Sequence, residues 1–111
     1  MKESINDKVR LQHILDAITE IESYISNVEF DDFVNNSMMT YACIKQLEII
    51  GEASNHISSL TKQNFSKIEW DKITGMRNIL VHEYFGVDIY IVWQIIKKDI
   101  PLLKQKISQI L

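Results

Sequence analysis

The fold is decided by the stretch from residue 89 to residue 110, IYIVWQIIKKDIPLLKQKISQI. Its first residues are apolar and β-branched, as in a strand, but its apolar positions keep a spacing of three or four over all 22 residues. A strand alternates with a period of two and could not bury one face along such a pattern. The positions are Ile89, Val92, Trp93, Ile96, Ile100, Leu103, Ile107 and Ile110. The pattern predicts a helix, with a kink or a break into two helices at Pro101, which lacks an amide hydrogen and crowds the carbonyl of Lys97.

The same helical spacing marks two segments upstream. One covers residues 7 to about 27, and the other covers residues 37 to about 60. A separate short turn at residues 30–33 is expected before the second segment, because the aspartates in that turn and Ser37 both favour helix starts.

Capping residues predict two further helix boundaries. Ser66 and Glu69 fit a capping box, in which the hydroxyl and the carboxylate satisfy backbone amides reciprocally, so a helix is expected to start there and to end near Gly86. Asp88 is the expected N-cap of the last stretch. Tight turns are few, since the 111 residues include three glycines and one proline. The sequence therefore predicts one all-α domain over residues 1–111, an antiparallel bundle of four or five helices.

Composition restricts the class of protein. Hydrophobic residues make up 46% and charged residues 24% of the chain, which is typical of a folded soluble domain. No apolar run approaches the roughly 18 residues of a membrane span, and the first residues do not resemble a leader, so we expect a cytoplasmic protein without a membrane partner. The single cysteine, Cys43, and three widely spaced histidines match no metal-ligand pattern. Neither a structural metal nor a cofactor is expected.

Charge is distributed unevenly along the chain. The net charge is −3, yet residues 61–111 carry 8 basic and 5 acidic side chains, whereas residues 1–60 carry 4 and 10. An anionic ligand should therefore meet the C-terminal half. The lysines of that half that lie near residues 77–84 in sequence are Lys62, Lys67, Lys72, Lys97 and Lys98. Their positions in the sequence leave open whether they share one surface.

A row of polar residues follows one face of the segment that ends near residue 60. Glu48, Glu52, Asn55 and Ser59 are spaced by four, three and four residues. The row is either a solvated surface, which is the commoner case, or it faces a site or a subunit interface, where a buried glutamate would need a partner.

The candidate functional site is the polar group RNILVHEY at residues 77–84. Asn78 and His82 lie four residues apart, so on a helix the amide can hold the imidazole in one tautomer. Arg77 lies five residues from His82, which is about 140° around a helix at roughly 100° per residue. The two side chains can converge only if the arginine curls back or a second copy of the chain completes the site.

An arginine and a histidine can cleave RNA together. The guanidinium binds a phosphate through its planar fork, and the imidazole moves protons near neutral pH. The ribose 2′-hydroxyl attacks the adjacent phosphate, and DNA, which lacks this nucleophile, is not an expected substrate. A two-fold dimer would place two such sets beside one phosphate. By chemistry alone, however, such a pair is more often a structural cap or a salt-bridge cluster.

Residues 70–88, WDKITGMRNILVHEYFGVD, resemble the signature of HepT-like proteins in the HEPN superfamily of prokaryotic helical domains. The core of that signature is an arginine, four residues, a histidine, one residue and a tyrosine, which Arg77, His82 and Tyr84 match. Residues 47–53, LEIIGEA, resemble the second-helix motif of the family, and residues 92–102 resemble its last helices. The resemblance covers about residues 5–110.

The resemblance implies a HEPN-like helical homodimer that acts as a metal-independent endoribonuclease toxin, with its active site at the dimer interface. Arg77 and His82 would be catalytic and Asn78 supporting. The implied partner is a nucleotidyltransferase antitoxin (MNT), which attaches AMP to the motif tyrosine. Tyr84 would be this acceptor, and the added negative charge would repel RNA.

Two other functions stay open at this point. In the first, the chain is a non-catalytic helical module that binds and positions the nucleotidyltransferase, with Arg77 and Tyr84 gripping the partner or its nucleotide. In the second, a weaker hypothesis, it binds small phosphate esters or nucleotides. The sequence does not specify the target RNA, the cleavage position or the number of AMP groups.

Overall fold

The computed structural model describes the backbone of residues 2–82 and 88–111 and the side chains of residues 6–77 and 88–111. The elements are α1 (Lys2–Tyr24), α2 (Phe30–Val34), α3 (Ser37–Asn55), α4 (Ser59–Asn64), α5 (Trp70–His82), α6 (Ile89–Gln94), the π-helical turn η1 (Ile95–Asp99) and α7 (Ile100–Ile110). The described residues form helices and no strand, which confirms the predicted all-α fold.

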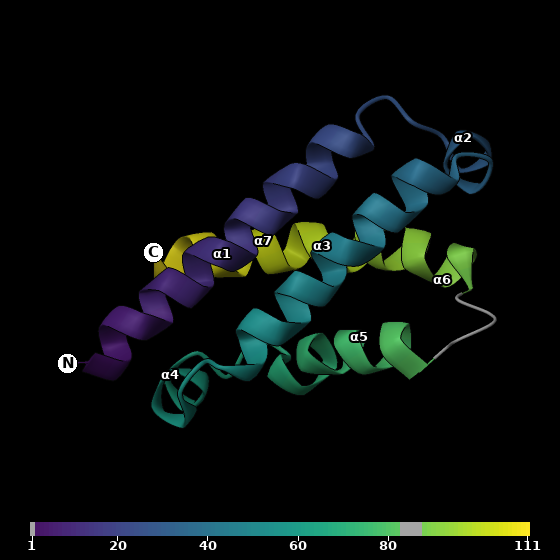
Figure 1. The fold of residues 1–111 in the computed structure, drawn as a ribbon. Coiled ribbons are helices and arrows are strands. Elements are labelled where there is room, and N and C mark those ends of the chain that lie inside the picture. The colour runs from purple at the N-terminus through teal and green to yellow at the C-terminus, as the bar shows by residue number, and fades with distance from the viewer. Residues whose placement is uncertain (1, 83–87) are drawn as a thin grey trace.

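Helix α3 is central to the bundle (Figure 1). It packs against α1 along one side and against α5 along another, and these are the two most extensive helix contacts. The short helix α2 turns the chain between α1 and α3, which therefore run antiparallel. The C-terminal stretch crosses the bundle, with α7 in contact with α1 and α6 in contact with α2.

The apolar stripes that predicted the helices form the core. The fully buried side chains include Leu11, Ile14, Ile18 and Ile21 of α1, Leu47 and Ile50 of α3, and Ile96, Ile100 and Ile107 of the C-terminal stretch. Phe33 of α2 closes one end, where its ring centroid lies 4.9 Å from that of Trp93. Burial of these apolar surfaces is the main force that holds the helices together.

The predicted kink or break at Pro101 takes the form of a change of helix type, with helical backbone on both sides of it. Immediately before the proline the chain forms the π-helical turn η1, in which the amide of Ile100 donates to the carbonyl of Ile95, five residues back. The wider turn spares the chain the clash that a proline ring causes with the carbonyl four residues before it. Pro101 then lies in the first turn of α7, where its missing N–H leaves no bond unmade.

The predicted boundaries of α1 are wrong at both ends. The helix begins at Lys2 instead of Asp7, and it ends at Tyr24 instead of near residue 27. Asp7 does not cap its own helix, because its carboxylate accepts hydrogen bonds from the backbone amide of Ser58 at 3.0 Å, the hydroxyl of Ser58 at 2.6 Å and the hydroxyl of Thr61. Asn27 adopts a left-handed φ of 58°, a conformation incompatible with continuation of the helix.

Those contacts also explain why the long helix predicted over residues 37–60 is too long. Helix α3 ends at Asn55, and Ser58 is the N-cap of a separate helix, α4, whose start is tied to α1 through Asp7. At the other end of α3, the separate short helix α2 is confirmed, but the N-cap is Asn36, whose side chain accepts from the amide of Met39 at 3.0 Å. Ser37 is already helical.

The predicted capping box at Ser66 and Glu69 is wrong as well, because α5 begins only at Trp70. The preceding residues form a turn in which the indole nitrogen of Trp70 and the amide of Ile68 both donate to the carbonyl of Phe65, each at 3.1 Å. The expected N-cap Asp88 is confirmed, since its side chain accepts from two amides of α6. The predicted helix end near Gly86 lies outside the described residues. No helix in the described parts of the chain is long and apolar enough to cross a membrane.

Candidate functional site

Arg77 lies where helix α5 crosses helix α3, and Gly51 of α3 is the residue beneath it. A Cβ atom on Gly51 would lie 3.0 Å from both the Cβ and the backbone nitrogen of Arg77, and 3.3 Å from the carbonyl oxygen of Ile73. The contacts of a Cβ atom at this position would be tighter than most Cβ contacts in proteins, so glycine favours the close approach. Gly51 therefore sets how closely the backbone at Arg77 lies to α3.

Two hydroxyl groups extend this close crossing. The buried Ser54 of α3 donates to the carbonyl of Gly51 at 3.0 Å, and its oxygen lies 3.1 Å from the hydroxyl of Thr74 of α5. Because the proton of Ser54 is already directed to Gly51, Thr74 is the donor of the interhelical bond. The crossing is thus fixed by small residues and by a hydrogen bond one turn away from Arg77.

The guanidinium of Arg77 is paired with a carboxylate from α3. Its Nη1 donates to Oε2 of Glu52 at 2.7 Å, while Oε1 of Glu52 lies 2.9 Å from Nε2 of His56. The Arg77 side chain is 30% exposed, but its Nε atom is buried and no described group bonds to it. Glu52 therefore bridges two basic side chains, and the terminal nitrogens of Arg77 are the part that a ligand could reach.

The surroundings of Glu52 keep it ionised. The hydrogen bond from Arg77, followed by the one from His56, lowers the pKa of Glu52 below its ordinary value. Its side chain is 56% exposed, so the ion pair with Arg77 is screened by water and contributes little to folding stability. The pair orients the guanidinium more than it stabilises the fold.

The structure describes the predicted site only in part. Arg77, Asn78 and His82 all belong to helix α5, as the sequence predicted, but the side chains of Asn78 and His82 lie outside the described residues. Tyr84 lies outside them entirely. Since α5 is continuous from Arg77 to His82, the angular separation predicted for these two residues applies.

The predicted polar row divides into two parts. Ser59 belongs to α4, not to α3, so the row ends at Asn55. Glu48 has a loose contact with Lys45, at 3.8 Å, whereas Glu52 contacts Arg77 of the candidate site. Sequence reasoning missed His56, although its spacing of four residues from Glu52 was a usable signal.

The lysines of the C-terminal half do not form one basic surface. Lys62 and Lys72 line the same shallow hollow between α4 and α5, together with the acidic Glu69 and Asp71. Lys97 lies over the ring of Trp93 on another helix, with its nitrogen 5.3 Å from the ring centroid.

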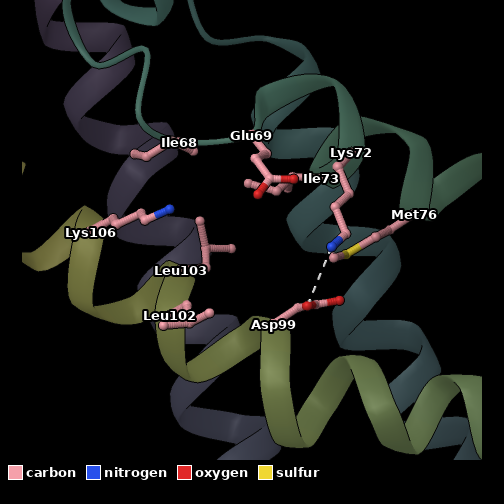
Figure 2. Close-up of a pocket in the computed structure, with 9 residues that line it drawn as sticks. All are labelled: Ile68, Glu69, Lys72, Ile73, Met76, Asp99, Leu102, Leu103 and Lys106. Carbon is pink, nitrogen blue, oxygen red and sulfur yellow. Dashed lines mark hydrogen bonds and ion pairs between the residues drawn. The ribbon is translucent and has the colours of Figure 1, made fainter.

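A second hollow, between α5 and α7, is too small to be a nucleotide site (Figure 2). Its volume is about 50 Å³, whereas ligand pockets usually hold about 300 Å³ or more. Lys72 points across it to Asp99, with 3.4 Å between Nζ and Oδ1. Arg77 lines neither hollow, so the candidate site is the α3–α5 crossing, where the arginine of the motif lies.

Comparisons with known proteins identify the family of the chain. A family model described as "Ribonuclease HepT-like" matches residues 14–110. No solved structure matches the chain significantly.

Three relatives illustrate the likeness. "Putative RNase MJ1380" of Methanocaldococcus jannaschii is 38% identical over 101 residues, which cover 91% of this chain and 93% of the relative. "Putative RNase TTE0752" of Caldanaerobacter subterraneus subsp. tengcongensis is 40% identical over 91% of this chain and 90% of its own length. "Probable ribonuclease HepT" of Thermococcus cleftensis is 40% identical over 99% of this chain and 98% of its own length. The chain belongs to the HepT-like ribonuclease family.

Proposed function

We propose that this chain is a metal-independent endoribonuclease whose active site is completed by a second copy of the chain. The observation that carries the proposal is Arg77, which the α3–α5 crossing and Glu52 hold with a partly exposed guanidinium in the family's motif. The family match and the names of the relatives support RNA as the substrate.

In the proposed reaction the 2′-oxygen of a ribose forms a bond to the adjacent phosphorus, and the bond from phosphorus to the 5′-oxygen breaks. His82 moves the protons of these steps, with Asn78 holding its ring. Arg77 stabilises the charge that develops on the phosphate. The products are a cyclic phosphate and a free 5′-hydroxyl, so water and redox partners are not consumed.

Two features support a dimer. The positions of Arg77 and His82 lie about 140° apart around α5, at roughly 100° per residue, so one copy alone presents the two residues poorly to one phosphate. In addition, Met38, Tyr41 and Ile49 are exposed apolar residues of α3, spaced to lie in one stripe with Glu52. A second copy packed on this stripe would bury apolar surface next to Arg77.

The proposed regulation uses Tyr84 and a nucleotidyltransferase antitoxin. The nucleotidyltransferase would transfer AMP from ATP to the hydroxyl of Tyr84 and release pyrophosphate. A negative charge two residues from His82 would repel RNA from the site. The pair would then act as a toxin and its antitoxin.

Cleavage of cellular RNA by the purified protein in EDTA tests the proposal. Wild type should cleave, and Arg77→Ala and His82→Ala should each lose at least about a hundredfold in rate, as removal of one charge-stabilising or proton-moving group does. Arg10→Ala and His13→Ala, which change the same residue types on α1, should cleave normally.

The same preparations, treated with the proposed nucleotidyltransferase antitoxin and ATP, should gain the mass of AMP and lose activity, whereas Tyr84→Phe should do neither. If clean wild type cleaves no RNA but binds the transferase, the protein is the non-catalytic module instead.

A further inference from the structure

We propose that Glu52 is a positioning residue, which holds the guanidinium of Arg77 in the orientation that a phosphate requires. This inference rests on the proposed function, because it assigns a role within the same site. Three observations carry it: the geometry of the ion pair, the burial of Nε in Arg77, and the second anchor on Glu52.

The burial of Nε limits how Arg77 can bind a phosphate. A guanidinium offers five N–H donors and usually grips a phosphate with two of them, in parallel. Because the Nε of Arg77 is buried, its N–H cannot donate to RNA. The two hydrogen bonds to a phosphate must therefore come from the two terminal nitrogens of the guanidinium. Glu52 accepts one N–H of Nη1 at 2.7 Å, which leaves the remaining terminal donors for the ligand.

Glu52 is itself held in place. Its other oxygen lies 2.9 Å from Nε2 of His56, and both residues belong to the last turn of α3 and its C-cap. The stem of Arg77 is fixed from the opposite side, where its Cβ packs directly over Gly51. The guanidinium is therefore restrained at its stem and at one terminal nitrogen, so less freedom is lost when a phosphate binds.

The same contact places a negative charge beside the proposed phosphate site. Glu52 neutralises the charge of Arg77 and should weaken RNA binding in the ground state, while it improves the alignment of Arg77 in the transition state. Its removal should consequently lower kcat without raising KM. A residue that only supported the fold would not produce this split.

Kinetics of Glu52→Gln test the inference. We expect kcat to fall about 10- to 100-fold, as misplacement of a catalytic group does, while KM stays equal or decreases. Glu52→Asp keeps the charge but is too short to reach, so kcat should fall similarly without a decrease in KM. Glu48→Gln, one turn earlier on α3, is the matched control and should behave as wild type. All variants should melt as wild type does, since exposed ion pairs stabilise proteins little.

A second measurement needs no activity. The chain contains two arginines, Arg10 and Arg77, so a nitrogen NMR spectrum of the guanidinium groups has two sets of signals. In wild type the Arg77 signals should show restricted rotation, and Glu52→Gln should shift them toward the position of a free arginine while Arg10 stays unchanged.

The outcomes distinguish a failure of the positioning role of Glu52 from a failure of the proposed ribonuclease function. Unchanged Arg77 signals in Glu52→Gln, or a kcat equal to that of wild type, overturn the positioning role even if wild type cleaves RNA. Wild type that cleaves no RNA refutes the proposed function, and the catalytic role of Glu52 with it. A shift of the Arg77 signals in that case would show that the proposed function failed, not the Glu52–Arg77 contact.

Discussion

Substitution by alanine should change the stability of the fold in opposite directions at Gly51, which lies at the α3–α5 crossing, and at Gly75, which lies in α5. In a helix, Gly→Ala normally stabilises by about 1 kcal/mol. Gly75 has no neighbour within 4 Å of a new Cβ, so Gly75→Ala should follow that rule. In Gly51→Ala the new Cβ would lie 3.0 Å from the backbone nitrogen and the Cβ of Arg77, and neither atom can move unless helix α5 shifts, so overpacking should destabilise the fold by about 1–3 kcal/mol.

Urea unfolding of both variants measures this difference, and RNA cleavage tests its consequence for the site. Because Gly51→Ala pushes α5 away from α3, Arg77 should lose its alignment and activity should fall, whereas Gly75→Ala should remain active. Equal stabilisation by both substitutions would contradict the close crossing. The resemblance pointed to the GEA sequence of residues 51–53, but the role of Gly51 depends on which helix lies opposite, and no local pattern states that.

At the scale of the elements, Asp7 makes the attachment of α4 dependent on pH. Burial alone would raise the pKa of this carboxyl, but hydrogen bonds from the Ser58 and Thr61 hydroxyls and the Ser58 amide, with the nearby charge of Lys62, lower it below its ordinary value of 3.8. Because the pKa of Asp7 is lower in the folded state, its stabilising effect is fully present at a pH above the pKa that Asp7 has in the unfolded chain. The effect is lost as the pH falls through the pKa that Asp7 has in the folded protein.

Asp7→Asn should therefore cost about 1–3 kcal/mol at neutral pH, the usual range for bonds to a charged buried group. The difference from wild type should shrink below about pH 4 and largely vanish at the acid end, where wild type is protonated too. Urea titrations over this pH range measure the difference in the free energy of unfolding. The control is Asp16→Asn, which changes an exposed aspartate of the same helix. A cost that does not change with pH would show that the charge of Asp7 is unimportant.

Element boundaries show where sequence reasoning succeeds. The break at Pro101 and the cap at Asp88 were predictable, because a missing amide hydrogen and a local side-chain cap act within a few residues. The start of α5 and the end of α3 were not. The indole of Trp70 bonds back to Phe65 in the preceding loop, a contact that the capping-box pattern does not include. Ser58 is held by Asp7, 51 residues away, so a contact with a distant residue overrides the local signal there.

For the whole molecule, the periodicity of apolar residues was enough to predict the bundle, since each stripe needs another helix to cover it. The motif also placed Arg77 correctly on a helix. It could not reveal that Glu52 and His56 reach this arginine, because the contact arises from the crossing angle of α3 and α5. The lysines, too, turned out to be divided between surfaces only once the helices were placed.

The dependence of activity on concentration tests the two-copy site. If Arg77 and His82 from both copies act on one phosphate, the active species has twice the chain mass of 13.0 kDa, and specific activity should fall on dilution as dimers separate. Met38→Glu places a charge on the exposed apolar stripe of α3, so it should yield monomers and reduce activity about tenfold or more at equal concentration.

Leu60→Glu is the control, because Leu60 is also an exposed apolar residue but belongs to α4 and not to that stripe. It should leave both the mass and the activity unchanged. Sedimentation and initial rates over the same dilution series provide the two readouts, and their midpoints should coincide because one equilibrium governs both. A wild type that is monomeric throughout, with constant specific activity, would place the whole reaction in one chain and would require Arg77 to curl back toward His82.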